Sequence, residues 1–147
     1  MGRDRRRDPA RTGREVPSLT AFLDTNVLIR HLTDDPPEAA ERATRFLEAG
    51  EPLILTDVIV AECVHVLESY YELDPDEVTR LIRSAFDLPC VRTLDPRSLL
   101  RALEIHAVTG IDFPEAYLVS LAEHTGVEQI VSFDRAIDRV PSVNRRE

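Results

Sequence analysis

Four short apolar runs, separated by long segments of helical periodicity, constrain the fold of this chain most strongly. The runs are Ala21-Phe22-Leu23, Leu53-Ile54-Leu55, Cys90-Val91-Arg92 and Gln129-Ile130-Val131. Strands joined by helices are typical of parallel sheets, so the sequence predicts an α/β fold with a central parallel sheet. We expect helices near residues 25–33, 36–48, 57–71, 75–87, 96–108 and 113–124, with Gly50, Gly110 and Gly126 just past three of their ends.

Three of these helices begin with the same local pattern. In Asp35-Pro-Pro-Glu38, Asp74-Pro-Asp-Glu77 and Asp95-Pro-Arg-Ser98 an aspartate precedes a proline. An aspartate carboxylate accepts hydrogen bonds from the free N–H groups of a first helical turn, and proline is favoured at the first helical position. The pattern predicts N-caps at Asp35, Asp74 and Asp95.

The composition excludes several classes of protein. A chain of 147 residues fits one domain. No run approaches the roughly 20 apolar residues that a membrane-spanning helix needs. No apolar segment follows the N-terminal arginines, as it would in a signal peptide. We therefore expect a cytoplasmic protein. Cys63 and Cys90 lie in apolar surroundings without metal-ligand spacing, which predicts two buried free thiols. The five glycines form no phosphate-binding loop, so a kinase or ATPase is disfavoured.

Charge is distributed unevenly along the chain. Residues 1–18 hold six arginines against three acids, and their local charge of +3 within a total of −9 leaves −12 on residues 19–147. The short basic segment is poor in apolar residues, so we expect a disordered tail over 1–18, either a solvated leader or an arm that attracts RNA, followed by one domain over 19–147. An acidic domain repels a phosphate backbone, and a nucleic-acid substrate therefore requires cations at the site of chemistry.

Three carboxylates occupy positions that favour a functional site. Asp24 and Asp134 each follow an apolar strand, and ligands gather at the carboxyl ends of parallel strands. Glu62 lies in an apolar helix, where a carboxylate needs a hydrogen bond, an ion partner or a cation. Purely structural roles stay open, because Asp24 and Asp134 also suit helix N-caps and His65 is placed to pair with Glu62.

Acids brought together at one sheet edge predict a particular chemistry. Neighbouring carboxylates stay ionised only when a cation neutralises them, and a set of oxygen ligands suits Mg²⁺ or Mn²⁺. Such an ion polarises a phosphate oxygen and lowers the pKa of a bound water, which makes the water a nucleophile for phosphodiester hydrolysis. The acids therefore predict a metal-dependent phosphodiesterase.

Four segments in order resemble the motifs of PIN-domain ribonucleases, in particular the VapC-like toxins of toxin–antitoxin pairs. They are Phe22-Leu-Asp-Thr-Asn-Val-Leu-Ile-Arg30, Val60-Ala-Glu-Cys-Val64, Asp112-Phe-Pro-Glu-Ala-Tyr-Leu118 and Val131-Ser-Phe-Asp-Arg135, within about residues 20–140. The resemblance implies a three-layer α/β/α fold, Mg²⁺- or Mn²⁺-dependent endoribonuclease activity on structured RNA, a cognate antitoxin as partner, and a homodimer. It also implies metal-site acids at Asp24, Glu62 and Asp134, oriented by Thr25, Asn26 and Ser132.

The third motif departs from the family pattern. The family has an acid directly before the alanine that opens a helix, and this chain has Glu115 there, with Asp112 three residues earlier. Both are therefore candidate metal ligands, and Glu115 is also a candidate catalytic acid. The segment Asp112-Phe-Pro-Glu115 fits a capping box equally well, in which Asp112 caps the helix.

The sequence alone leaves further functions open. A haloacid-dehalogenase type phosphatase needs a second acid two residues after the strand-end aspartate, and Asn26 occupies that position. An RNA-processing nuclease without an antitoxin and a non-catalytic RNA-binding module are two further candidates. For a toxin, the resemblance places the antitoxin on two apolar helix faces, although both faces could instead pack on the sheet. The faces comprise Ala40, Ala43, Phe46 and Leu47, and Val78, Leu81, Ile82 and Ala85.

Overall fold

Residues 20–147 are described by the computed structural model, and in them short parallel strands alternate with helices. One sheet contains β1 (Ala21–Phe22), β2 (Leu53–Leu55) and β3 (Val91–Thr93) in that order, and β4 (Gln129–Val131) pairs with β5 (Asn144–Arg146) in a second. All three strand pairings are parallel, with Phe22 opposite Ile54 and Ile130 opposite Arg145. The α/β fold class is confirmed. The division into two sheets and the strand β5 were not predicted.

The six α-helices of the described residues differ from their predicted bounds by at most two residues. The described residues also contain one 3₁₀ helix, η1, which begins one residue after Asp134. The bounds are α1 (Thr25–Thr33), α2 (Pro37–Glu48), α3 (Asp57–Ser69), α4 (Pro75–Phe86), α5 (Pro96–Thr109), α6 (Phe113–Thr125) and η1 (Arg135–Arg139).

Two of the three predicted aspartate caps are confirmed. The Asp74 carboxylate accepts a hydrogen bond from the Glu77 N–H at 2.9 Å, and Asp95 accepts one from the Ser98 N–H at 3.1 Å. The cap predicted at Asp35 is wrong. The second proline of that segment, Pro37, is the first residue of α2, so the helix begins one residue later and the N-cap position falls on Pro36. The carboxylate of Asp35 instead accepts a hydrogen bond from the hydroxyl of a tyrosine that follows α3.

A continuous apolar core joins the strands to the helices, and its largest members are buried leucine, isoleucine and valine side chains. Leu55 on β2 and Leu67 on α3 are completely buried, as expected for a strand covered by helices. Cys63 and Cys90 are buried free thiols, as predicted. Within residues 20–147 no helix is long and apolar enough to cross a membrane. The tail predicted over residues 1–18 lies outside the described part of the chain.

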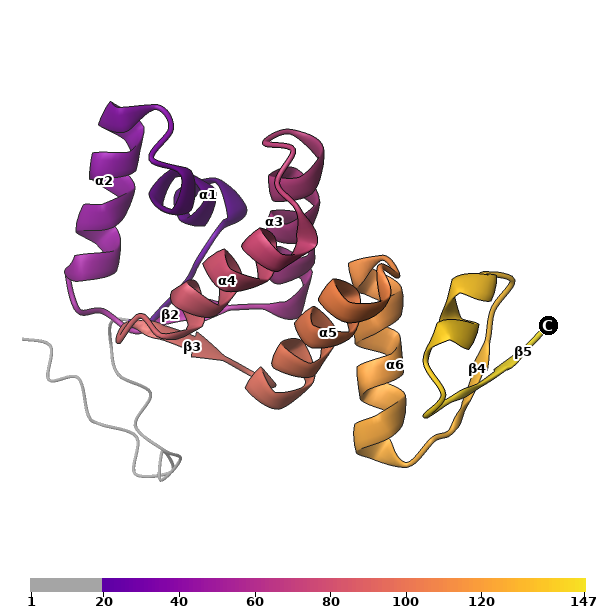
Figure 1. Cartoon of the computed structure of the whole chain (residues 1–147). Helices are drawn as coiled ribbons and strands as arrows, with labels where there is room; N and C mark the ends of the chain where they lie inside the picture. The colour runs from indigo at the N-terminus through magenta and orange to yellow at the C-terminus, as the bar shows by residue number, and fades with distance from the viewer. Residues whose placement is uncertain (1–19) are drawn as a thin grey trace, which may run out of the picture.

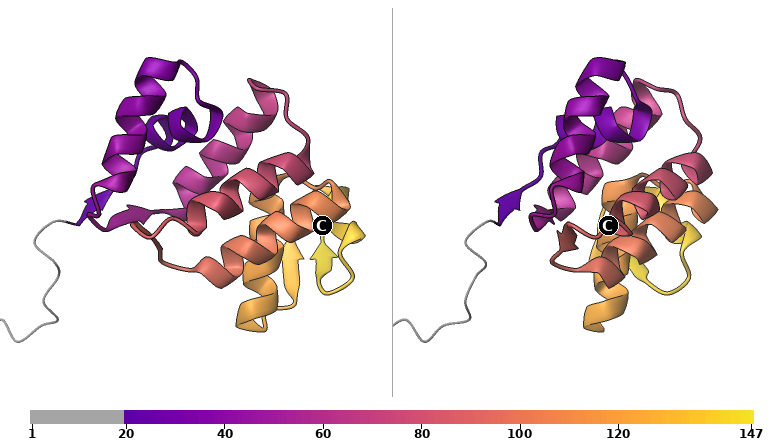
Figure 2. Two further views of the ribbon diagram at one scale, coloured as in Figure 1. Left: turned by 60° about the vertical axis from the view of Figure 1, so that its left-hand side comes forward. Right: turned by 90° about the vertical axis from the view of Figure 1, so that its left-hand side faces the viewer.

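The two sheets lie apart, with helices between them. Figure 1 shows β4 and β5 beyond α5 and α6, on the side away from β2 and β3. In the left view of Figure 2, β1, the indigo arrow, lies at the opposite side of the molecule from the orange and yellow arrows of β4 and β5. Large apolar side chains are exposed on both sheets, Phe22 on β1 at 73% and Val131 on β4 at 80%. Each sheet thus keeps an apolar strand in contact with solvent.

Candidate active site

The strand β1 and the helix α3 bring Asp24 and Glu62 into one pocket. Leu23 is buried beneath the sheet edge, Asp24 follows it, and Thr25 begins α1. The Thr25 side chain is buried and its hydroxyl donates a hydrogen bond of 2.8 Å to Oε2 of Glu62. Asp24, Thr25, Asn26 and Glu62 line a cavity of about 480 Å³. The two strongest sequence candidates are therefore neighbours.

Neither of these acids serves the structural role that the sequence left open. Asp24 occupies the N-cap position of α1, but its side chain makes no capping hydrogen bond. His65 does not pair with Glu62, because its Nδ1 lies 3.3 Å from Oγ of Ser69. Both carboxylates are exposed to solvent. Their oxygens are available to a ligand that enters the pocket.

A buried thiol beside the pocket responds to the negative charge there. Burial, followed by the charges of Glu62 and Asp24, raises the pKa of Cys63 to about 12. The hydrogen bond with Thr25 acts in the opposite direction. The thiol therefore stays protonated at neutral pH and is no nucleophile. The same negative potential attracts a cation to the pocket.

The pocket also contains a cation and two aromatic rings that sequence reasoning missed. Arg30 lines it from α1, and its Nη1 donates a hydrogen bond of 3.0 Å to the carbonyl of Asp35. Tyr70 and Tyr71 line it from the end of α3, with ring centroids 4.9 Å apart. The sequence could have indicated Arg30, because Arg30 lies four residues after Asn26 and thus on the same helix face. The adjacent tyrosines follow directly on the apolar helix that carries Glu62.

The two candidates of the third motif line a different pocket. Asp112 and Glu115, at the start of α6, border a cavity of about 500 Å³ together with His65 and Glu68 of α3. Asp112 occupies the N-cap position, but its side chain makes no capping hydrogen bond. The capping-box interpretation is therefore not supported. Within residues 20–147 neither carboxylate takes part in a hydrogen bond or an ion pair.

Asp134 lies in a third place, between β4 and η1. Its carboxylate accepts a hydrogen bond from the Ala136 N–H at 2.9 Å, which confirms the helix-cap interpretation that the sequence left open. Ser132 supports this turn, since its hydroxyl accepts a hydrogen bond from the Asp134 N–H at 3.0 Å. The five candidate acids thus lie in three places: Asp24 with Glu62, Asp112 with Glu115, and Asp134 by itself. Nowhere in the described part of the chain do three His, Cys, Asp or Glu side chains gather closely enough to hold a metal ion.

The sequence matches the PIN domain family over residues 21–143. The chain belongs to the PIN domain family. The match covers every helix and the strands β1 to β4, so the family expected from the motifs is confirmed. PIN domains are typically metal-dependent nucleases, and membership indicates a nuclease in general. No curated protein gives a significant match to the chain.

The pocket of this PIN domain fits part of a divalent-cation site. Mg²⁺ is commonly held by one or two protein carboxylates, with water and substrate phosphate oxygens completing its shell. Asp24 and Glu62 supply two carboxylates, and Asn26 adds an amide oxygen at the same wall. The Thr25 hydroxyl fixes one oxygen of Glu62 and leaves the other free to bind. The donor set is composed of oxygen atoms, as this class of ion prefers.

Proposed function

We propose that this PIN domain is a Mg²⁺- or Mn²⁺-dependent endoribonuclease and the toxin of a type II toxin–antitoxin pair. The observation that carries the proposal is the pocket in which Asp24 and Glu62 lie together, with Thr25 bonded to Glu62 at 2.8 Å. Two exposed carboxylates without a neutralising partner repel each other and the RNA backbone. A divalent cation bound in the pocket would offset both repulsions.

The residues of the pocket would have different roles in phosphodiester hydrolysis. Asp24 and Glu62 would hold the ion, which polarises a phosphate and lowers the pKa of a water molecule. Thr25 holds the Glu62 carboxylate in place. Arg30 lines the same cavity and carries guanidinium donors that match phosphate oxygens. Together these residues would bind a phosphate of the substrate.

The tyrosines favour RNA with unpaired bases as the substrate. Bases of single-stranded loops stack on exposed aromatic rings, whereas paired bases are inaccessible. Tyr70 is 74% exposed beside the acids, and Tyr71 is held by a hydrogen bond from its hydroxyl to Asp35 at 2.9 Å. An exposed ring next to a fixed ring suits stacking of a base whose phosphate lies in the pocket.

A groove beside the pocket supports the antitoxin as partner. Phe46 of α2 is 65% exposed and borders a groove between α1 and α2, and Asn26 and Arg30 line both this groove and the acidic pocket. An apolar segment bound over Phe46 would reach the acids, where a basic residue would neutralise them. Of the expected α2 face only Phe46 is exposed, since Ala40, Ala43 and Leu47 are buried. The expected α4 face does not fit. Its Val78, Ile82 and Ala85 side chains are completely buried, because α4 packs between α3 and α5.

One substitution tests the nuclease assignment directly. Asp24→Asn removes a charge from the pocket, so we expect most RNA cleavage to disappear while the melting temperature stays the same or rises slightly through relieved repulsion. Asp87→Asn, the same change at an exposed residue after α4, is the matched control and should leave cleavage unchanged. A fully active Asp24→Asn protein would contradict the assignment.

The toxin assignment has its own test. Induction of the chain in bacteria should arrest growth, and production of the protein encoded immediately upstream should relieve the arrest and yield a complex on purification. Phe46→Asp should weaken that complex without changing the RNA cleavage of the isolated chain, because Phe46 lies outside the acidic pocket. RNA cleavage without growth arrest or a co-purifying partner would support an RNA-processing nuclease instead.

A further inference from the structure

Asp35, in the loop between α1 and α2, binds two residues that line the acidic pocket. The backbone carbonyl of Asp35 accepts a hydrogen bond of 3.0 Å from Nη1 of Arg30, and its carboxylate accepts one of 2.9 Å from the Tyr71 hydroxyl. Arg30 and Tyr71 line the same cavity as Asp24 and Glu62, whereas Asp35 is not part of its lining. Asp35 therefore holds two residues of the pocket without entering it.

The carboxylate of Asp35 has no role in the helix that follows it. An aspartate before a proline is well placed to cap a helix, and Asp74 and Asp95 do so in the same sequence pattern. After Asp35 the helix begins two residues later, at Pro37, and no side chain caps it. Departures from a local preference are expected at functional sites. The Asp35 carboxylate is bound instead to Tyr71, at the pocket.

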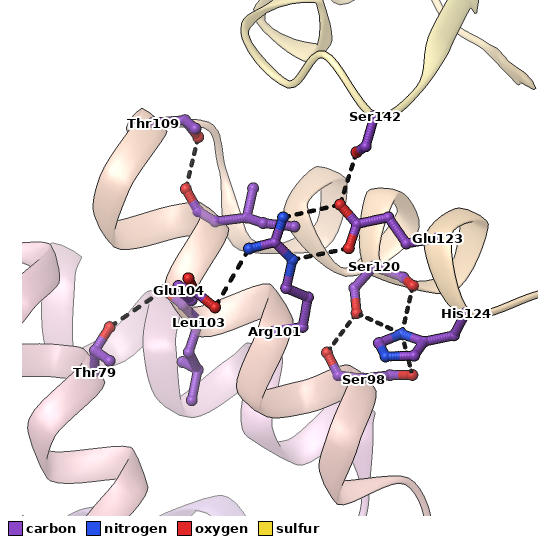
Figure 3. A network of polar contacts seen from close by, with 11 residues as sticks. Thr79, Ser98, Arg101, Leu103, Glu104, Thr109, Ser120, Glu123, His124 and Ser142 are labelled. Atoms are coloured by element: carbon purple, nitrogen blue, oxygen red, sulfur yellow. Dashed lines mark hydrogen bonds and ion pairs between the residues drawn. The ribbon is translucent and has the colours of Figure 1, made fainter. Parts of the chain in front are cut away.

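The contact with Asp35 orients Arg30 without neutralising its charge. A backbone carbonyl carries no net charge, so the guanidinium stays positive and most of its N–H groups stay available. Figure 3 shows the opposite case, in which the Arg101 guanidinium is bonded to the Glu123 carboxylate at 2.8 and 2.9 Å and also contacts Glu104 at 3.3 Å. Within residues 20–147 Arg30 makes no ion pair. Arg30 is thus fixed and ready to bind a phosphate.

The Tyr71 residue is held at both of its ends. Its hydroxyl donates to the Asp35 carboxylate, and its backbone N–H donates to the Val66 carbonyl of α3 at 3.3 Å. The neighbouring Tyr70 ring packs edge-on against it, with centroids 4.9 Å apart and planes at 76°, and remains 74% exposed. A fixed ring thus supports an exposed ring on which a base can stack.

We propose that Asp35 is a positioning residue of the nuclease site, which holds Arg30 and Tyr71 so that a phosphate and a neighbouring base of one RNA strand bind together. The phosphate and the base are linked covalently, so both bind well only when their protein partners keep a fixed separation. One residue bonded to both partners fixes that separation before RNA arrives, which lowers the entropy lost on binding. This inference rests on the proposed function, because it assigns single-stranded RNA to the same pocket.

A purely structural role for Asp35 predicts different measurements. A bond that only ties the α1–α2 loop to the end of α3 would affect the melting temperature and leave RNA binding unaltered. A positioning role acts through two oxygen acceptors, the carbonyl and one carboxylate oxygen, so it requires neither the charge of Asp35 nor a contact with RNA. The amide oxygen of asparagine can replace the carboxylate oxygen as acceptor.

Steady-state kinetics with a single-stranded RNA oligonucleotide separate the two roles. Asp35→Ala removes the acceptor for the Tyr71 hydroxyl, so we expect KM to rise roughly fivefold, the equivalent of one hydrogen bond, while kcat changes by less than about twofold. The melting temperature should fall by no more than about 5 °C. Asp35→Asn should keep the wild-type KM. An Asp35→Ala protein with wild-type KM, or an asparagine variant as impaired as the alanine variant, would overturn the proposal.

Glu38→Ala is the matched control for the lost charge. Glu38 is exposed in the first turn of α2, and within residues 20–147 its side chain has no hydrogen bond or ion pair. This substitution removes one negative charge near the same loop but no contact with the pocket, so KM should not rise. A KM that rises as much in Glu38→Ala as in Asp35→Ala would reveal an effect of charge or helix stability and would contradict the positioning role.

Tyr71→Phe tests the same hydrogen bond from its other partner, and it keeps the test decisive if Asp35→Ala does not fold. Phenylalanine keeps the ring and loses the hydroxyl, so KM should rise by a factor similar to that of Asp35→Ala, with no further rise in the double variant. Effects of the two substitutions that multiply would mean that Asp35 acts through another contact, and the proposal would fail.

A second cycle of variants tests the contact with Arg30. Arg30→Gln should raise KM about tenfold in the wild type and clearly less in Asp35→Ala, where the loop no longer holds the guanidinium in place. Equal losses in the two backgrounds would overturn the role of Asp35 toward Arg30. A wild type that neither cleaves nor binds the oligonucleotide would refute the proposed function and this inference together, whereas an active wild type with unaltered KM in the Asp35 variants would refute the inference alone.

Discussion

The Thr25 hydroxyl donates a hydrogen bond of 2.8 Å to Oε2 of Glu62, which joins the first residue of α1 to the middle of α3. These residues are 37 positions apart in the sequence. The contact places a carboxylate of one helix beside Asp24 at the end of β1. A buried hydroxyl that orients an acid in this way resembles the supporting contacts around metal ligands.

Thr25→Val should therefore impair the nuclease more than the fold. Valine fills the same buried space without the hydroxyl, so Glu62 loses its partner and we expect a loss of about tenfold in cleavage rate or in apparent Mg²⁺ affinity. The free energy of unfolding should fall by no more than about 1.5 kcal/mol, the value of one hydrogen bond. Thr25→Ser, which keeps the hydroxyl, is the control. Equal activity of the valine and serine variants would refute the orienting role.

Tyr70 provides a test of RNA binding that is separate from the acids. Tyr70→Ala removes a stacking surface, so we expect KM for a single-stranded RNA substrate to rise about tenfold, given roughly 1–3 kcal/mol per stacked base. The value of kcat should change little, and Tyr70→Phe should keep wild-type KM. A Tyr70→Ala protein with unchanged KM would show that bases lie elsewhere.

The elements of the fold were predicted well because each depends on local chemistry. Asp74 and Asp95 cap their helices by hydrogen bonds to residues three positions later, and such contacts are visible in the sequence. The cap predicted at Asp35 was wrong because either of two successive prolines can begin a helix, and α2 begins at the second, Pro37. The short β5 lacked a signal, since Asn144-Arg145-Arg146 is polar throughout.

The site was predicted in part, because contacts across the fold decide it. Strand-end position and an apolar helix identified Asp24 and Glu62, which the structure brings together. Strand-end position also placed Asp134 at this edge, and the family resemblance made Asp112 and Glu115 candidate metal ligands, but the structure holds these three acids in two other places. That separation follows from the packing of α5 and α6 on α3, which depends on long-range contacts such as Tyr117 with Asp57.

The two acids at the start of α6 remain distinguishable by substitution. Within residues 20–147 neither has a hydrogen-bond or ion partner, so Asp112→Asn and Glu115→Gln should each change the free energy of unfolding by less than about 0.5 kcal/mol. We expect Glu115→Gln to lose more RNA cleavage, because Glu115 directly precedes the alanine as the family's acid does. The reverse order of losses would make Asp112 the third acid, and small, equal losses would exclude both.

The Arg101 and Glu123 pair predicts a pH dependence of stability. A hydrogen bond from Arg101 lowers the pKa of Glu123 below its usual value. A lowered carboxyl pKa stabilises the fold above the unfolded pKa of about 4.3, and the gain disappears as pH falls through the lower folded value. Glu123→Gln should cost about 1 kcal/mol at pH 7, allowing for partial solvent screening, and the difference from wild type should shrink below pH 4. Glu104→Gln, at the more exposed partner of Arg101, should cost less.

Metal dependence is measured as the cleavage of single-stranded RNA by the purified wild-type chain at increasing concentrations of Mg²⁺ or Mn²⁺. We expect no cleavage in the presence of a chelator and a rate that rises and saturates as either ion is restored, because Asp24 and Glu62 repel phosphate until a cation binds. Asp24→Asn should show no such rise at any ion concentration. Cleavage by the wild type that a chelator leaves undiminished would contradict a metal-dependent nuclease.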